Sequence, residues 1–344
     1  MTVDSGTFDV RDEQFMRRAI GTAAQARLVA RPNPWVGAVV VARDGSTYEG
    51  CTSAPGGPHA EIVALRHAGE AARGATLYST LEPCSHTGRT GPCTTAIIDA
   101  GISRVVVGVG DPDPKVSGSG IAALRAAGIT VDIGVGAGQV STQLAPYLHH
   151  RRTGRPWVVL KMAGTLDGRT AAADGTSKWI TGPVARMRVH ELRAESDAVL
   201  VGAGTVRADD PELTVRDAAG PSPRRVVLGR APVNAKVHPC TEWSGSLDDL
   251  LADLGRNDVL QLLVEGGARV AGDFHRRGLV DSYVFHLAPA IAGGGDAAGF
   301  FAGDAVRNIA DLWRGRIVST QQLGDDVEIV VERPDNSPEK ADKP

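Results

Sequence analysis

The stretch of sequence that decides the fold of the first half is Thr80-Leu81-Glu82-Pro83-Cys84-Ser85-His86-Thr87-Gly88-Arg89-Thr90-Gly91-Pro92-Cys93. It contains two cysteines, Cys84 and Cys93, and it follows His59-Ala60-Glu61 along the chain. One imidazole and two thiolates are three zinc ligands, which leaves the fourth tetrahedral position for water. Zinc lowers the pKa of such a water toward ~7, and Glu61 can carry its proton to a leaving group. The sequence therefore predicts a catalytic zinc centre with ligands His59, Cys84 and Cys93, and with Glu61 as the catalytic acid and base.

The order H-x-E followed by P-C is typical of zinc nucleobase deaminases. A structural zinc site is the alternative, but it normally has four protein ligands, and neither Cys51 nor Cys240 is well placed; both are expected to be ordinary buried thiols. Most deaminases of this kind carry the cysteines as C-x-x-C, whereas eight residues separate them here. The insert carries His86 and Arg89, which either face a phosphorylated substrate or lie in solvent.

The pattern around these motifs predicts a layered α/β domain with a largely parallel sheet, because strands alternate with helices. Asp44-Gly45 indicates a turn after the first strand. The expected strands are 36–41, 75–79, 105–109 and 130–135, and the expected helices are 12–29, 60–72, 94–100 and 120–127.

A second α/β series follows a connector at residues 151–156. We expect a first domain over 1–150, a second over 151–333, and a disordered tail over 334–344, which has no apolar anchor. The expected strands of the second domain are 158–161, 197–201, 225–229, 260–264, 282–288 and 326–332, the last alternating like an edge strand, and the expected helices are 183–195 and 268–277.

Glycine-rich turns in the second half indicate phosphate binding. Glu265-Gly266-Gly267 joins a buried strand to a helix, which lets backbone approach a phosphate at the helix N-terminus. Residues 202–207 lack the third glycine of the dinucleotide fingerprint and are interpreted, taken alone, as a tight turn. Residues 293–295 are three glycines and indicate either another backbone approach or a flexible loop.

Charge and composition exclude several classes of protein. The 344 residues carry a formal net charge of −3, with a pI near 6.3, which argues against a nucleic-acid-binding protein. The four cysteines do not form a disulfide framework for a chain of this length. The charged N-terminus does not look like a signal peptide, and no apolar run is long enough to span a membrane. We therefore expect a cytoplasmic protein.

The motifs together resemble the bacterial family of bifunctional riboflavin-biosynthesis enzymes, RibD (also called RibG). In the first half the similar segments include Asn33-Pro34, His59-Ala60-Glu61, residues 80–93 and Asp111-Pro112. In the second half they are Thr153-Gly154-Arg155-Pro156, Lys161, Leu166-Asp167-Gly168-Arg169, Trp179-Ile180-Thr181, residues 209–216 and Glu265-Gly266-Gly267. The resemblance covers residues ~12 to 332 and carries two unrelated motif sets in the family's order.

The resemblance implies a cytidine-deaminase-like three-layer N-terminal domain. This domain would deaminate 2,5-diamino-6-ribosylamino-4(3H)-pyrimidinone 5′-phosphate with one Zn²⁺ per chain, and Asn33, His86 and Arg89 would contact the substrate. The sequence departs from the family at Thr52, usually His, and at Asp113, usually Asn. We expect these two departures to weaken substrate binding.

The resemblance also implies a dihydrofolate-reductase-like C-terminal domain, which would use NADPH to reduce the ribosyl group of 5-amino-6-(5-phosphoribosylamino)uracil to ribityl. Lys161 would act on the sugar oxygen as the catalytic residue. Trp179 would line the cofactor or pack in the core, and Arg230 would bind the 2′-phosphate or lie in a solvated turn. The other expected cofactor residues are Ala163, Thr205, Asp209, Gly267, Ala268, Arg269, Val270, Ala271, Gly272 and Asp273, and the expected substrate residues are Ser177, Arg193, Leu213, Arg216 and Glu265.

Two alternatives remain at this level. The second half has a segment, 230–259, that is shorter than is usual in the family, so a degenerate reductase half without activity stays possible. A nucleic-acid-editing deaminase would need basic and aromatic stretches that the sequence lacks. We expect a homo-oligomer, a dimer or a tetramer, that binds a small phosphorylated pyrimidine and neither nucleic acid nor membrane.

Overall fold

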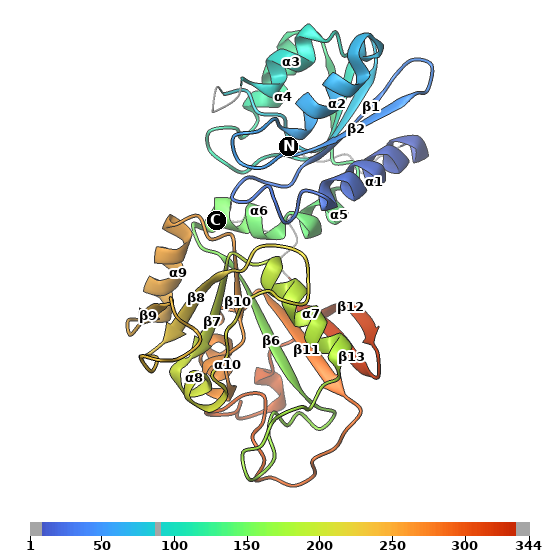
Figure 1. Ribbon diagram of the computed structural model, residues 1–344. Helices are drawn as coiled ribbons and strands as arrows, with labels where there is room; N and C mark the ends of the chain where they lie inside the picture. Colours follow the sequence, from blue (N-terminus) through green and yellow to red (C-terminus); the bar gives the residue numbers. More distant parts are fainter. Residues whose placement is uncertain (1–8, 87–90, 335–344) are drawn as a thin grey trace. The chain divides into compact units, whose positions relative to one another are not determined.

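The computed structural model describes residues 9–86 and 91–334, and the chain separates into two compact units, residues 1–153 and 154–344 (Figure 1). The expected tail begins at Pro334, and the rest of it lies outside the described residues. None of the described helices is long and apolar enough to cross a membrane.

The first unit is built on a five-stranded sheet in the order β2-β1-β3-β4-β5. Its parallel part is β3, β4 and β5, while β1 runs antiparallel to both of its neighbours. β2, which the sequence analysis did not predict, is an edge strand that closes a hairpin at Asp44-Gly45. The strands are β1 (Gly37–Val41), β2 (Thr47–Cys51), β3 (Thr76–Leu81), β4 (Arg104–Val109) and β5 (Thr130–Ile133).

Helices cover both faces of this sheet, which gives the expected three layers. A side-chain carbon at Gly37 would lie 1.9 Å from the Ala19 carbonyl of α1, and one at Gly50 would lie 2.4 Å from the Ala60 carbonyl of α2, so glycine allows each helix to approach. Figure 1 shows α2, α3 and α4 on one side and α1 and α5 on the other. The helices are α1 (Val10–Ala24), α2 (Ala60–Ala68), α3 (Cys93–Asp99), α4 (Ser119–Ala126), α5 (Ala137–Gln143) and α6 (Ala145–Thr153).

Several boundaries in this unit differ from prediction. α1 ends at Ala24, before residue 29, and α2 ends at Ala68 because Gly69 adopts a positive φ of 51°. A 3₁₀ turn, Gly69–Ala72, completes the expected helix. The expected connector at 151–156 begins inside α6, so Arg151 is helical.

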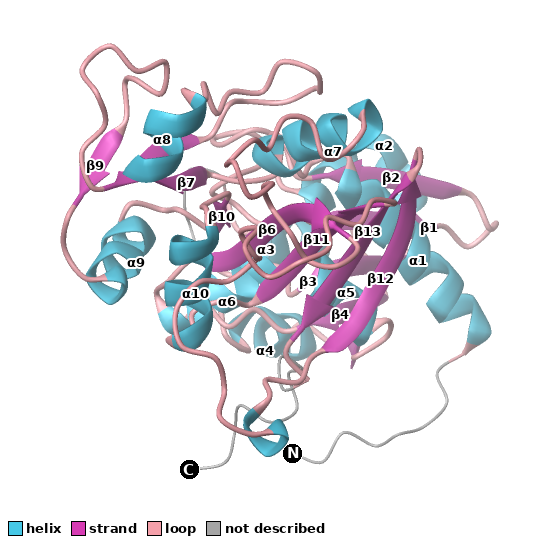
Figure 2. Cartoon of the chain, turned by 90° about the horizontal axis from the view of Figure 1, so that it is seen from below, coloured by secondary structure: helices cyan, strands magenta, loops and turns pink. Residues whose placement is uncertain are grey.

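The second unit is built on an eight-stranded sheet in the order β12-β13-β11-β6-β10-β7-β8-β9. In this order, every pair of neighbouring strands from β11 through β6, β10, β7 and β8 to β9 is parallel. β13 runs antiparallel to β11, and β12 runs antiparallel to β13. The prediction of residues 326–332 as an edge strand was wrong, because β12 pairs outside them (Figure 2). The strands are β6 (Trp157–Thr165), β7 (Ala198–Gly202), β8 (Arg224–Leu228), β9 (Thr241–Trp243), β10 (Gln261–Val264), β11 (Ser282–Ala288), β12 (Arg316–Leu323) and β13 (Asp326–Glu332).

The core of this unit lies between the sheet and two helices. Leucines of α9 (Leu247–Arg256) and Phe274 of α10 (Ala268–Arg276) pack with Leu160 and Leu262 of the central strands. α7 (Pro183–Ala194) packs against β13. Residues 202–207, expected to form a tight turn, instead begin helix α8 (Ala203–Asp209), so that interpretation was wrong.

Candidate active sites

The three expected metal ligands come together in the first unit. The Nδ1 atom of His59 lies 3.6 Å from the Cys84 Sγ and 3.3 Å from the Cys93 Sγ. His59 is the residue before α2, Cys84 follows β3, and Cys93 is the first residue of α3. The backbone N–H of Cys93 donates a hydrogen bond to the Cys84 sulfur at 3.4 Å. No other group of three or more His, Cys, Asp or Glu residues suited to a metal occurs in the part of the chain that the structure describes.

The chemistry of this donor set fits zinc. A hydrogen bond from the Cys93 thiol lowers the pKa of Cys84 to about 4, and the same hydrogen bond raises the pKa of Cys93, because the donating thiol keeps its proton and a second thiolate beside the first would be repelled by it. A dication between the sulfurs removes that repulsion and favours both thiolates. Among the described residues, no fourth protein ligand of the kind that a structural zinc site needs joins this group. Cys51 and Cys240 lie outside the group and are half-buried, not buried as expected.

Glu61 lies in the first turn of α2 and is buried in the wall of a cavity of about 380 Å³. Burial raises the pKa of Glu61 to about 7. His59 and Cys84 line the same cavity, and Glu61 does not belong to the metal-binding group. The arrangement places a carboxyl group beside the metal site without using it as a ligand.

The rest of this cavity contains both expected and unexpected residues. Asn33 and His86 line it, as expected of substrate contacts, while Arg89 lies outside the described residues. Tyr147 and Arg151 of α6 also line it, and the sequence analysis did not single them out. The further lining residues with polar side chains are Thr52, Glu82, Asp111 and Asp113.

Glu82 fixes the loop that follows β4. Its carboxylate accepts hydrogen bonds from the backbone N–H groups of Gly118 and Gly120 at 3.0 and 2.9 Å, and from Asp111 and Ile121 at 3.3 and 3.2 Å. Because Glu82 precedes Pro83 and Cys84, one carboxylate ties this loop to the segment that carries a metal ligand. The sequence analysis did not single out Glu82. Its position directly after a parallel strand could have indicated it, since binding residues gather at the carboxyl ends of such strands.

The two departures from the family pattern both line this cavity. The Thr52 hydroxyl is buried and accepts a hydrogen bond from the Val36 N–H at 3.0 Å. The Asp113 carboxylate lies 3.6 Å from the Nε of Arg151. The negative charge at position 113 is therefore balanced by a neighbouring cation.

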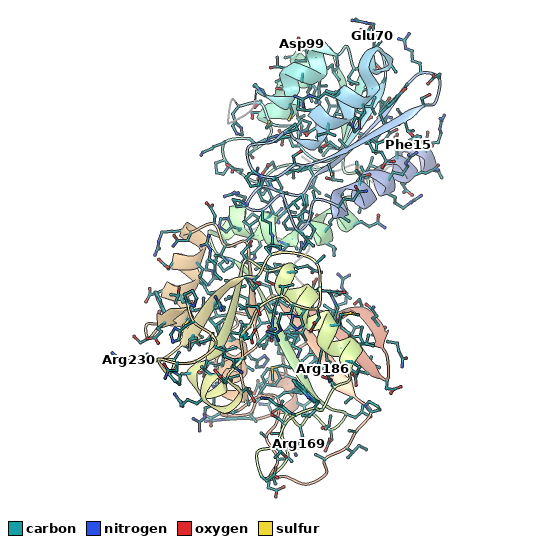
Figure 3. All side chains as sticks on the ribbon, viewed as in Figure 1. Phe15, Glu70, Asp99, Arg169, Arg186 and Arg230 are labelled. Carbon is teal, nitrogen blue, oxygen red and sulfur yellow. The ribbon has the colours of Figure 1, made fainter. Side chains whose placement is uncertain are left out.

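A second cavity, of about 530 Å³, opens in the second unit between α7, the carboxyl end of β10 and the loops around residues 177–181 and 209–216. Trp179 lines it with an exposed ring, 71% accessible, so this side chain does not pack in the core. The guanidinium of Arg186 lies 4.7 Å from that ring, and Figure 3 labels Arg186 on α7. The other expected residues that line this cavity are Lys161, Ala163, Ser177, Arg193, Asp209, Leu213, Arg216, Glu265, Gly267 and Ala268.

A charged cluster forms the floor of this cavity. Arg193 donates to both oxygens of Glu265, at 2.7 and 2.8 Å, and both side chains are 11% exposed. Burial lowers the pKa of Lys161, and Glu265 opposes that effect. Burial also disfavours the Glu265 carboxylate, but Arg193 holds the pKa of Glu265 below its ordinary value. Lys161 lies inside β6 and not at the strand end that was expected.

The two glycines after β10 have different roles. A side-chain carbon at Gly266 would lie 2.6 Å from Val270, so Gly266 permits packing of α10, whereas Gly267 is exposed at the helix start. A side-chain carbon placed on Gly267 would lie 3.5 Å from the hydroxyl oxygen of Thr205 in α8. Two helix N-termini therefore lie beside each other, an arrangement suited to a phosphate.

The remaining expected cofactor residues do not line this cavity. Ala271 is buried in the core, Gly272 packs against the Ala302 carbonyl, and Asp273 pairs with Arg276. Val270 packs partly against the same core, and Arg269 is exposed. Arg230 is exposed at the end of β8, and Figure 3 shows it pointing outward.

The loop of three glycines is held by the turn after β6. Asp167 accepts hydrogen bonds from the N–H groups of Ala292 and Gly293, and Arg169 donates to the Gly294 carbonyl. Hydrogen bonding from Thr165 lowers the pKa of Asp167 to about 2. This contact explains the Leu166-Asp167-Gly168-Arg169 motif as a loop anchor.

Comparisons with known proteins agree with this division. Residues 9–109 match the family model described as cytidine and deoxycytidylate deaminase zinc-binding region, and residues 156–329 match the one described as RibD C-terminal domain. The riboflavin biosynthesis protein RibD of Escherichia coli is 38% identical over 92% of this chain and 98% of its own. The RibD of Mycobacterium tuberculosis is 40% identical over 92% of this chain and 95% of its own.

Solved structures give the same result. The structure of RibD from Acinetobacter baumannii superposes with a TM-score of 0.88 at 37% identity, covering 94% of this chain and 98% of that one. A Thermotoga maritima structure, described as a diaminohydroxyphosphoribosylaminopyrimidine deaminase/5-amino-6-(5-phosphoribosylamino)uracil reductase, superposes with a TM-score of 0.84 at 35% identity, with the same coverage.

Fold and sites together define a two-part enzyme, in which a zinc-dependent deaminase half precedes an NADPH-dependent reductase half. The chain belongs to the RibD family of bifunctional riboflavin-biosynthesis enzymes. The expected α/β fold of both halves is confirmed, and a degenerate reductase half is not favoured.

Proposed function

We propose that this chain deaminates 2,5-diamino-6-ribosylamino-4(3H)-pyrimidinone 5′-phosphate and then reduces the ribosyl group of the product to ribityl. The observation that carries the proposal is the presence, in one chain, of the His59, Cys84 and Cys93 group beside buried Glu61 and of the Lys161, Arg193 and Glu265 cluster in a second cavity. A coupled assay with this substrate, zinc and NADPH tests it, following ammonia release and NADPH oxidation separately. Ammonia release without NADPH oxidation would leave a deaminase alone.

In the first site, His59, Cys84 and Cys93 would hold the metal, which when bound supplies a Lewis acid and an activated water. Glu61 accepts a proton at its carboxylate and delivers it to the departing amine. Burial keeps this carboxyl group away from bulk water, so the proton is retained between the two transfers. Asn33 and His86 line the cavity where they can orient the pyrimidine.

In the second site, Lys161 is the proton donor to the sugar oxygen, because burial lowers the pKa of its ammonium group and eases transfer. NADPH, when bound, supplies the reducing equivalent. Glu265 and Arg193 hold each other and keep Lys161 beside a fixed carboxylate. Ser177, Leu213 and Arg216 would surround the substrate, and Trp179 would cover the cofactor ring.

The N-termini of α8 and α10 would bind the cofactor phosphates, and Arg230 would bind the 2′-phosphate. A side-chain carbon at Gly229 would lie 3.2 Å from Ala203, the first residue of α8, so Arg230 follows a residue in contact with that helix start. A charge-assisted contact contributes roughly 1.5–3 kcal/mol, about 10- to 150-fold in affinity. We expect Arg230→Ala to raise the KM for NADPH by that factor and to leave the KM for NADH unchanged.

Lys236→Ala is the matched control for Arg230, because Lys236 lies in the same segment and lines the cavity while pairing with Asp210. An equal rise in the KM for NADPH and in the KM for NADH in Arg230→Ala would mean that the arginine supports the structure and does not bind the 2′-phosphate. If only Lys236→Ala discriminates NADPH from NADH, the 2′-phosphate is bound at Lys236.

We also propose that the chain forms a homo-oligomer through the edge of its second sheet. β12 is the outermost strand, and Ile317 is 61% exposed on it. An exposed edge strand presents unpaired backbone N–H and C=O groups, which can pair with the edge strand of another copy. Light scattering of the wild type and of Ile317→Lys tests this: the wild type should be a dimer or tetramer, and a monomeric wild type would contradict the proposal.

A cytoplasmic location is proposed on chemical grounds. Cys84 and Cys93 must stay reduced to act as thiolate ligands, and a reducing compartment ensures this. Cell fractionation tests the location.

A further inference from the structure

A buried histidine of α7 lines the cavity of the second unit beside the charged cluster on its floor. The side chain of His190 is 8% exposed, and it borders the cavity together with Arg193 and Arg216. Buried polar groups in proteins are hydrogen-bonded. The partners of the two ring nitrogens therefore show what this side chain does.

Both ring nitrogens of His190 meet the segment that carries Arg216. The backbone N–H of Arg216 donates a hydrogen bond to Nδ1 at 3.2 Å, and Nε2 lies 3.3 Å from an Asp217 carboxylate oxygen. A backbone N–H can only donate, so Nδ1 carries a lone pair, and the ring hydrogen of the neutral imidazole is on Nε2, toward Asp217. The hydrogen bond from Arg216 therefore requires His190 to be neutral.

The same segment is bound to α7 a second time, one helical turn further along. Arg193, three residues after His190 and on the same face of the helix, donates to the Thr214 carbonyl at 3.2 Å. The neighbouring Leu213 is buried and has a positive φ of 56°, which residues with a side chain rarely adopt unless their surroundings impose it. The backbone of this segment therefore depends on its contacts with α7.

The groups that face His190 keep it neutral. Burial lowers the pKa of His190 from its ordinary value of 6.5, and the guanidinium groups of Arg193 and Arg216 act in the same direction. The carboxylates of Asp217 and of Glu265, which follows β10, oppose this effect without reversing it. The imidazole is therefore neutral at pH 7, and it gains a proton on Nδ1 only at lower pH.

We propose that His190 is a positioning residue of the reductase, which holds the backbone of Arg216 so that Leu213 and Arg216 meet the substrate. This inference rests on the proposed reduction of 5-amino-6-(5-phosphoribosylamino)uracil. Because the pKa of His190 is lowered while it accepts the Arg216 N–H, a proton favours the released segment. The contact is therefore present above about pH 6.5 and is lost as the pH falls through the lower value in the folded site.

The test follows the KM for supplied intermediate against pH in the wild type and in His190→Asn. The asparagine amide oxygen takes the place of Nδ1 as an acceptor and does not titrate. We expect the two KM values to be equal at pH 7, and the wild-type value to become about 2- to 10-fold higher than that of His190→Asn at pH 5, as for loss of one hydrogen bond. The substrate phosphate also titrates, near about pH 6, but it does so for both proteins and cancels in their ratio.

His190→Leu removes the acceptor at every pH. Its KM at pH 7 should be about 2- to 10-fold above that of the wild type, and the ratio of its KM to that of His190→Asn should not change with pH. The kcat values should differ less than the KM values, because Lys161 and its neighbours are intact.

Amide hydrogen exchange gives a measurement that needs no substrate. The protection factor of the Arg216 amide should fall below pH 6.5 in the wild type and stay constant in His190→Asn. His275→Asn is the matched control: the Nδ1 of His275 lies 2.8 Å from the Tyr283 hydroxyl, and burial lowers the pKa of His275 as well, but its side chain does not line this cavity. Its KM and protection factors should follow those of the wild type at each pH.

Three results would overturn the proposal: a wild-type KM equal to that of His190→Asn down to pH 5, a wild-type KM at pH 7 in His190→Leu, or an Arg216 amide that is unprotected at pH 7. If the wild type does not oxidise NADPH with the supplied intermediate, the proposed function itself fails. Hydrogen exchange then still decides whether His190 holds the segment.

Discussion

Glu61 is the residue whose role is most sharply separated from that of its neighbours. It is buried beside the metal site and stands apart from the ligand group. We expect Glu61→Gln to keep full zinc, measured by metal analysis, while deamination falls by at least about 100-fold, the usual loss for a positioned proton carrier. The amide keeps the shape of the side chain and cannot carry the proton.

The control for Glu61→Gln is the reductase rate on supplied intermediate, which should equal that of the wild type. Loss of zinc in this variant would instead make Glu61 a ligand or a support for one.

The metal ligands could be predicted from the sequence because they lie in short motifs with recognisable spacing. His59 and Glu61 are two residues apart, and Cys84 and Cys93 share one segment. Arg151 and Tyr147 could not be predicted, because they reach the cavity only after α6 packs beside a loop far from it in sequence. Arg193 and Glu265 were expected to bind substrate directly, and the structure adds that they bind each other.

At the scale of elements, an ion-pair network around Asp12 joins α1 to the central strands of the first unit's sheet. Asp12 accepts hydrogen bonds from Tyr78 of β3 at 2.6 Å and from both terminal nitrogens of Arg104 of β4, at 2.8 and 2.7 Å. The Arg104 hydrogen bond holds the pKa of Asp12 below its ordinary value of 3.8. This network fixes the helix that covers one face of the sheet.

We expect Asp12→Asn to lower the free energy of unfolding of the first unit by about 2 kcal/mol at pH 7. Because the folded-state pKa of Asp12 is lowered, its stabilisation is present above about pH 3.8 and is lost as the pH falls through the lower folded value. The difference between variant and wild type should therefore shrink below pH 4, measured by hydrogen exchange of β4 amides in urea.

Asp132→Asn is the matched control, because Asp132 bonds the same Arg104 at 2.7 Å but is 40% exposed. An exposed pair contributes about 1 kcal/mol or less. A difference for Asp12→Asn that does not change between pH 7 and pH 3 would contradict the electrostatic account.

Most elements with one clear hydrophobic period were predicted, with α9 as the exception, and the other missed elements have a physical reason. β12 is exposed over most of its length, so its sequence shows no alternation, and β9 has only three residues. The segment 230–259 was interpreted only by its length, so α9 within it was not predicted, although its leucines form part of the core. α8 was missed because Gly202 and Gly204 favour a turn when tertiary contacts are ignored.

At the scale of the whole molecule, the residues proposed for each of the two reactions fall within one compact unit. The metal ligands and Glu61 belong to residues 1–153, and Lys161, Arg193 and Glu265 belong to residues 154–344. The two reactions should therefore be separable by mutation. Cys84→Ser replaces a thiolate ligand with a neutral hydroxyl, and Lys161→Met removes an ammonium group while keeping a similar length.

We expect Cys84→Ser to lose its zinc and its deaminase activity while it reduces supplied intermediate at the wild-type rate. Lys161→Met should keep its zinc and release ammonia normally, while NADPH oxidation falls by at least about 100-fold, as for loss of a positioned proton donor. A mixture of the two variants should convert the starting pyrimidine fully, because each contributes one intact site. Full zinc in Cys84→Ser would refute the ligand assignment, and loss of both activities in either variant would show that the two units do not work as separate sites.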